Sequence, residues 1–85
     1  MFEILEHLKA AKFKVVGVKQ VQKAAQKGQV EVVFMADDAE PHVLRALQQF
    51  CEEQNIPVVK VPTMLELGKA AGIQVGSATV AVLKA

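Results

Sequence analysis

The sequence predicts an α/β protein, a three-layer α/β/α sandwich whose mixed, mostly parallel sheet has about four strands. Four runs rich in β-branched residues alternate with stretches of helical spacing, which gives the order β-α-β-α-β-α-β behind a leading helix near residues 2–10. Connections that pass through helices favour parallel strands with helices on both faces of the sheet. The 85 residues contain no repeat and no linker, so a single domain over residues 1–85 is expected.

Each predicted strand is a short run rich in β-branched residues. The runs cover residues 13–16, 30–36, 56–61 and 78–83. Val, Ile and Phe favour the pleated, half-buried surface of a sheet, and runs of this length are typical of strands.

The helix predicted over residues 18–27 has two distinct faces. Lys19, Lys23 and Lys27 are four residues apart, so they form one basic stripe that points away from the core. Gly28 follows and offers a left-handed end to the helix. The opposite face carries Val18, Val21 and Ala25.

Two further helices are predicted from their termini. Pro41 suits the first turn of the third helix, where its missing N–H costs nothing, and Asn55 is a suitable end. Residues 63–66 form a capping box at the start of the fourth helix, which ends at Gly72. The apolar stripe of the third helix consists of Val43, Leu44, Leu47, Phe50 and Cys51.

Composition excludes several classes of protein. One cysteine makes neither an internal disulfide nor a zinc ribbon. The longest apolar run, residues 32–36, is far shorter than a transmembrane helix, and the first residues lack the pattern of a signal peptide. With 52% hydrophobic residues the chain is expected to fold. We therefore expect a reduced, soluble, cytoplasmic domain without a membrane partner.

The net charge of +1 conceals a segregation of charge along the chain. Residues 7–30 carry six lysines and no acid, whereas residues 31–66 carry seven acids against Arg45 and Lys60. An unopposed basic block is either an anion-binding surface or a solvated lysine-rich face, and charge alone does not choose between them.

Few residues suggest catalysis. Cys51 lies on an apolar helical stripe, which favours a packing role over a nucleophile, and His7 and His42 have no spacing that suits a metal pair. Asp37 and Asp38 follow an apolar strand, where they could hold Mg²⁺ in a small phosphotransfer or metal enzyme, but no later strand supplies a third aspartate. A role in a turn and at the start of a helix is favoured. We predict no catalytic residue, no metal ligand and no cofactor.

The start of the helix behind Gly17 is a candidate site for nucleic acid. A helix that opens there directs free backbone N–H groups outward, where they suit phosphate oxygens. Gln20 in the first turn can bond a base edge twice, and Lys19 can donate to guanine. Lys23 and Lys27 follow one and two turns later, in reach of further phosphates of the same strand.

The segment 72–77 links the fourth predicted helix to the last strand. Its two apolar residues, Ile73 and Val75, either pack inward on a short loop or form an apolar platform under extruded bases. Glycines recur at positions 68, 72 and 76, but in a soluble chain this spacing does not indicate a membrane dimer motif.

Five motifs occur in an order that resembles a known family. They are residues 17–23 (GVKQVQK), 27–28 (KG), 35–41 (MADDAEP), 51–53 (CEE) and 67–72 (LGKAAG). Together they are similar to the kink-turn RNA-binding family, which includes the archaeal ribosomal and box C/D protein, its eukaryotic spliceosomal and small nucleolar counterparts, and small bacterial ribosomal-protein-like members. The resemblance spans about residues 15–83, and Lys19-Gln20 and the short length look most like the bacterial members.

The resemblance implies an α/β/α sandwich and a non-enzymatic RNA-binding function. Family members bind a kink-turn, a helix–bulge–helix RNA with tandem sheared G·A pairs, and the helix near Val18 would enter the groove at those pairs. Many members have Asn-Glu where this chain has Lys19-Gln20; Gln20 still accepts a hydrogen bond from guanine but brings no charge. Glu40 matches an acidic position facing the RNA, and residues 73–75 match the loop that contacts flipped-out bulge nucleotides. The implied RNA-binding residues are Gly17, Val18, Lys19, Gln20, Lys23, Lys27, Glu40, Leu44, Ile73, Gln74 and Val75.

The expected partner is an RNA that contains a kink-turn, such as a ribosomal RNA, a riboswitch or an RNase P-type RNA. We expect a monomer that associates with the ribosome. The alternative is a ribosome-associated or protein-interaction module of the same fold without kink-turn recognition. The lysine stripe distinguishes the two hypotheses, because only the first requires it.

Overall fold

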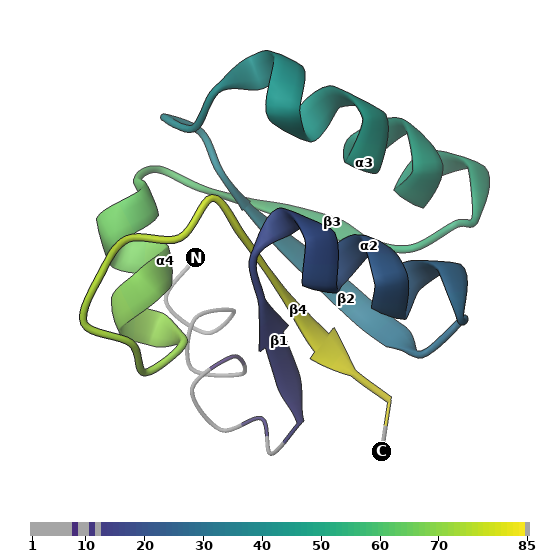
Figure 1. Cartoon of the computed structure of the whole chain (residues 1–85), viewed down its shortest axis with the longest axis horizontal. Coiled ribbons are helices and arrows are strands. Elements are labelled where there is room, and N and C mark those ends of the chain that lie inside the picture. The colour runs from purple at the N-terminus through teal and green to yellow at the C-terminus, as the bar shows by residue number, and fades with distance from the viewer. Residues whose placement is uncertain (1–7, 9–10, 12, 85) are drawn as a thin grey trace.

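The structure of this protein is a computed structural model that describes residues 8, 11 and 13–84. The elements follow in the order β1 (Lys14–Val16), α2 (Val18–Gln26), β2 (Val30–Ala36), α3 (Pro41–Glu53), β3 (Val58–Val61), α4 (Met64–Ala70) and β4 (Thr79–Leu83) (Figure 1). This alternation confirms the predicted order of strands and helices. The predicted leading helix near residues 2–10 lies outside the described residues except for Leu8, whose side chain is buried in the core.

The four strands form one mixed sheet in the order β1-β4-β2-β3. The prediction of a four-stranded mixed sheet is confirmed, but the expected majority of parallel pairs is wrong. Only β2 and β3 pair in parallel, whereas β4 runs antiparallel to both β1 and β2. The helical crossovers do give β1, β2 and β3 a common direction, but β4 lies between β1 and β2 and points the other way. Strand β4 is buried along most of its length, so its sequence shows a central strand without showing its direction.

The helices form the outer layers of the sandwich. Helices α2 and α3 lie side by side on one face, while α4 packs against β2, β3 and β4 (Figure 1). The largest fully buried side chains come from the central strands and from the inner faces of the helices. They include Phe34, Met35, Val80, Val21 and Leu67. In the described part of the chain, no helix has the length and apolar character needed to cross a membrane.

The predicted ends of the helices and the two predicted faces of α2 are confirmed. The backbone is left-handed at Gly28, Asn55 and Gly72, so α2, α3 and α4 end where their sequences suggest. Thr63 Oγ1 accepts a 3.1 Å hydrogen bond from the backbone N–H of Glu66, as a capping box requires. In α2, Val21 and Ala25 are buried and Val18 is half-buried, and the three stripe lysines are exposed.

Cys51 is buried in α3, as the apolar stripe predicts. Burial raises the pKa of its thiol, and the nearby Glu52 carboxylate raises it further. A thiol held in its protonated form away from solvent is a poor nucleophile, which supports the packing role.

We expect the Cys51 thiol to react with a chromogenic disulfide reagent at least about tenfold more slowly in the folded protein than in the unfolded chain. The raised pKa belongs to the folded state, so the contribution of this thiol to stability is present below the pKa of the unfolded thiol. That contribution is lost as the pH rises through the pKa of the folded state. The denaturant concentration at the unfolding midpoint should therefore decrease when the pH is raised above the ordinary cysteine pKa. Equal labelling rates in the two states would contradict the buried position.

Candidate nucleic-acid interface

The N-terminus of α2 is open. Gly17 is its N-cap with φ 102°, a left-handed conformation that favours glycine, and a Cβ placed there would meet no atom within 4 Å. The carbonyl of Gly17 accepts the first helical hydrogen bond from Val21 N–H at 2.9 Å. Because glycine has no side chain, Gly17 makes no capping hydrogen bond to the first turn of α2. The N–H groups of that turn are therefore left for an external acceptor. Such a terminus suits an anion.

The three stripe lysines lie at increasing distances from the N-terminus of α2. Lys19 and Gln20 are exposed in the first turn of α2, and Lys23 is exposed one turn later. Lys27 is the C-cap of the nine-residue helix, about 13 Å along the axis from its start. The structure therefore brings Lys19 and Gln20 to the open terminus beside Gly17, and it leaves Lys27 at the other end of the helix.

A buried polar pair connects the start of α2 with the loop before β4. The carbonyl of Thr79 accepts a hydrogen bond from Gly17 N–H at 3.0 Å and another from Ser77 Oγ at 2.9 Å. The Thr79 hydroxyl donates to the carbonyl of Phe34 at 2.8 Å. Ser77 and Thr79 are the buried polar residues of the described chain, and their hydrogen bonds tie the loop, the start of α2 and strand β2 together. Sequence reasoning did not single out this pair.

The loop 73–76 is held closely against α4. Ile73 N–H donates to the carbonyl of Gly68, and Ser77 N–H donates to the carbonyl of Met64, both at 3.0 Å. A Cβ at Gly68 would overlap the carbonyl oxygen of Val75, so only glycine permits this approach. A Cβ at Gly76 would also lie tightly against Met64. Gly68 and Gly76, two of the three glycines spaced four residues apart, therefore allow the loop to pack closely on α4.

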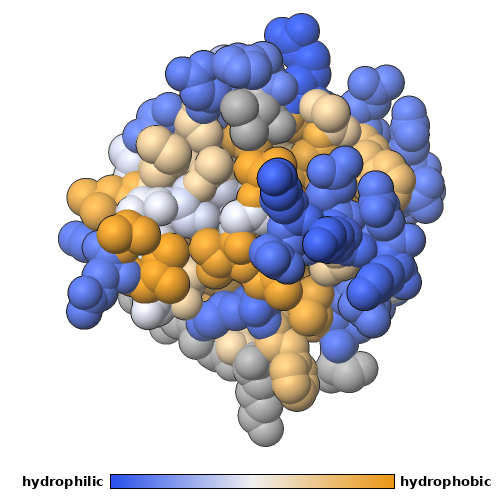
Figure 2. Space-filling model, in the orientation of Figure 1, coloured by the Kyte–Doolittle hydropathy of each residue, from blue (hydrophilic) through white to orange (hydrophobic). Residues whose placement is uncertain are grey.

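The loop presents an apolar surface to solvent. The side chain of Val75 is 68% exposed, so the alternative in which it packs inward is wrong. Gln74 is exposed and Ile73 is half-buried. Figure 2 shows apolar side chains gathered over α4 and this loop. An exposed apolar surface at a fixed position is what a platform for unstacked bases requires.

The turn between β2 and α3 contributes the remaining predicted residues. Glu40 is the exposed N-cap of α3, and its Oε2 lies 3.4 Å from Nδ1 of His42. Leu44 is only 5% exposed, so it packs beneath the first turn of α3 and presents little surface. At this edge, therefore, Glu40 is available as an acceptor and Leu44 acts as support.

Asp38 caps a helix that is distant in sequence. Its Oδ1 accepts a 2.8 Å hydrogen bond from the backbone N–H of Met64, the first residue of α4. The sequence predicts a role for Asp38 at a helix start, and the helix that it caps is α4. Helix α3, which follows Asp38 directly, has no side-chain hydrogen bond at its own start. The bond ties the β2–α3 turn to α4, and with it to the loop that α4 supports.

These segments meet at one edge of the sheet, where β1, β2 and β3 end and β4 begins (Figure 1). The edge combines free backbone N–H groups, exposed lysines, a carboxylate acceptor and an apolar loop. These are the groups that suit a polyanion with unstacked bases. The fold and this edge define the class of protein: a small α/β/α domain that presents a helix N-terminus and a clamped apolar loop side by side.

The chain belongs to the ribosomal protein L7Ae/L30e/S12e/Gadd45 family, whose model matches residues 1–85. This assignment agrees with the resemblance found in the sequence motifs. It also agrees with the layered architecture, in which one end of a mixed sheet carries the open start of α2 and the exposed apolar loop.

Several known proteins are similar to the chain. It is 47% identical over 68 residues to an RNA-binding protein of Caldanaerobacter subterraneus subsp. tengcongensis, covering 80% of this chain and 83% of that protein. It is 42% identical over 70 residues to RNA-binding protein YbxF of Geobacillus stearothermophilus, covering 82% and 85%. Among solved structures, a Bacillus halodurans C protein of unknown function superposes with a TM-score of 0.82 at 33% identity, covering 95% and 81%. The Giardia lamblia 15.5kD RNA binding protein shares the fold, with a TM-score of 0.84 at 24% identity over 95% and 68%.

Proposed function

We propose that this chain is a non-enzymatic RNA-binding protein that recognises and stabilises kink-turn RNA. One observation carries the proposal: Thr79 joins the open N-terminus of α2 to the loop that exposes Val75, at a single edge of the sheet. A kink-turn offers both matching features, since its G·A pairs open a groove and its bulge extrudes bases. Relatives more than 40% identical are named RNA-binding proteins, which supports the same class of ligand.

The proposed contacts follow from this geometry. The N-terminus of α2 enters the groove, where the Gln20 amide oxygen accepts from guanine and the first-turn N–H groups donate to phosphate oxygens. Lys19 and Lys23 neutralise phosphates of the same strand, and Val75 supports the extruded bases. Because these contacts form only with the bent RNA, binding shifts the RNA population toward the kinked form.

The cellular setting follows as part of the same proposal. A ribosomal RNA, a riboswitch or an RNase P-type RNA would present the required kink. We propose a cytoplasmic monomer that associates with the ribosome. The competing function is a protein-interaction module of the same fold, for which the open terminus of α2 has no role.

Fluorescence transfer between the two ends of a labelled kink-turn RNA tests the proposal. Adding the protein should shorten the end-to-end distance, and converting the tandem G·A pairs to Watson–Crick pairs should weaken binding by at least about a hundredfold, or about 2.7 kcal/mol. An unchanged distance, or equal affinity for the two RNAs, would reject kink-turn recognition and favour the protein-interaction module.

A further inference from the structure

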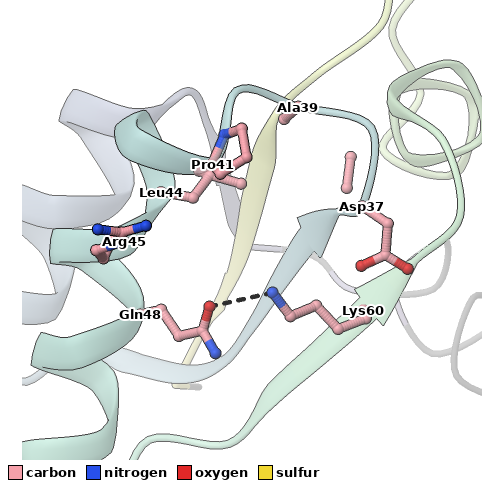
Figure 3. A pocket seen from close by; sticks show the side chains of 8 residues that line it. Asp37, Ala39, Pro41, Leu44, Arg45, Gln48 and Lys60 are labelled. Carbon is pink, nitrogen blue, oxygen red and sulfur yellow. Dashed lines mark hydrogen bonds between the residues drawn. The ribbon is translucent and has the colours of Figure 1, made fainter.

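A pocket of about 190 Å³ lies beside the proposed RNA interface, between α3 and the ends of β2 and β3 (Figure 3). Its lining includes Asp37, Pro41, Leu44, Arg45, Gln48 and Lys60. The pocket is smaller than the roughly 300 Å³ at which small-molecule sites usually begin, so it suits one chemical group rather than a whole cofactor.

The pocket gathers the cations of an otherwise acidic part of the chain. Arg45 and Lys60 are the only arginine and lysine between positions 31 and 66, and both line it although they come from different elements. Lys60 Nζ donates to Gln48 Oε1 at 3.1 Å, which orients the ammonium across the pocket without neutralising it (Figure 3). Among residues 13–84, no carboxylate lies within 4.0 Å of either cation. Their positive charge is thus available to an external anion.

The remaining lining restricts the kind of anion. Leu44 and Pro41 provide an apolar wall, and the Asp37 carboxylate borders the pocket on the side of Lys60 (Figure 3). A ligand that fills this space must place its negative charge near Arg45 and Lys60 and a hydrogen-bond donor near Asp37. A ribonucleotide unit has both groups, because its phosphate is anionic and its ribose 2′-hydroxyl can donate.

We infer that this pocket holds one phosphoribose unit of the RNA strand that flanks the kink, with the phosphate on Arg45 and Lys60 and the 2′-hydroxyl donating to Asp37. The inference rests on the proposed function and extends the RNA contact beyond α2 and the loop. The position supports an RNA strand as the occupant, because the pocket and Glu40 share the β2–α3 turn at the same edge of the sheet.

Salt-dependent binding of a kink-turn RNA with long flanking stems provides the first test. The Arg45→Gln/Lys60→Gln variant should bind about 3- to 10-fold more weakly than the wild type, and the slope of log affinity against log salt should fall by about one. The matched control is Lys14→Gln/Lys84→Gln, which removes two charges at the opposite end of the sheet and should leave the slope nearly unchanged. Equal losses in the two variants would show a general charge effect and overturn the inference.

A scan of single methylphosphonate linkages in the RNA identifies the phosphate. One flanking linkage should weaken wild-type binding yet leave the Arg45→Gln/Lys60→Gln variant unaffected, because the variant has already lost that contact. A 2′-deoxy substitution at the same nucleotide should weaken the wild type and have no effect on Asp37→Ala, which has lost the acceptor. If the wild type binds kink-turn RNA and no linkage shows this coupling, the pocket inference fails while the proposed function stands. If the wild type does not bind, both fail.

Discussion

Replacing Gly68 with alanine is expected to destabilise the protein by about 3 kcal/mol and to weaken RNA binding. The new Cβ would overlap the carbonyl of Val75, so the loop must move away from α4. Overpacking of this kind costs about 1–3 kcal/mol, and each backbone hydrogen bond lost as the loop moves costs about 1 kcal/mol more. The bonds at risk are those from Ile73 to Gly68 and from Ser77 to Met64.

The effect should reach the RNA interface through a defined set of contacts. Ser77 shares the Thr79 carbonyl with Gly17, so a displaced loop loosens the start of α2 as well as the position of Val75. Denaturant unfolding gives the loss of stability, and RNA affinity is measured at a temperature where the variant is fully folded. We expect affinity to fall by at least about tenfold, which corresponds to about 1.4 kcal/mol.

The matched control is Gly72→Ala. Gly72 has φ 84° and open space around its missing Cβ, so alanine there costs only about 1–2 kcal/mol of backbone strain and causes no clash. RNA affinity should stay close to that of the wild type, because the loop retains its contacts with α4. A Gly68→Ala protein that unfolds at the wild-type midpoint would show that the loop is not clamped as the structure indicates.

Local features of this fold are predictable from the sequence because their causes are local. The lysine stripe of α2, the left-handed residue Gly28 and the Thr63 capping bond each depend on residues within about one helical turn. The same applies to the open helix start at Gly17, whose lack of a side chain both permits the backbone angle and leaves the N–H groups free.

Long-range features are not predictable in this way. The placement of β4 between β1 and β2 depends on pairing between residues that are up to 68 positions apart, as Lys14 and Val82 are, and a buried apolar strand has the same pattern in either direction. The bond from Met64 to Asp38 spans 26 positions. The glycine spacing at Gly68 and Gly76 was visible in the sequence, but its purpose appears only when the loop lies on α4. The RNA contacts expected of α2, of Glu40 and of the loop 73–75 stay a prediction.

The Lys19→Ala/Lys23→Ala variant is expected to lose RNA binding while keeping its fold. Both side chains are exposed on the outer face of α2, so their removal should change the free energy of unfolding by no more than about 0.5 kcal/mol. If each lysine neutralises one phosphate, the slope of log affinity against log salt should fall by about two. Affinity for a kink-turn RNA at moderate salt should drop by about a hundredfold, or about 2.7 kcal/mol.

The third stripe residue distinguishes docking at the helix start from a general charge effect. Lys27 carries the same charge as Lys19 but lies at the C-terminal end of α2. If the RNA docks at the open terminus, the single variants should lose affinity in the order Lys19→Ala, Lys23→Ala, Lys27→Ala, with the largest loss first. Equal losses along the stripe would mean that the lysines act as a uniform basic face, in which case the groove contact of Gln20 would have no support. A protein whose RNA affinity is unaffected by all three changes would instead match the protein-interaction module, because that function needs no stripe.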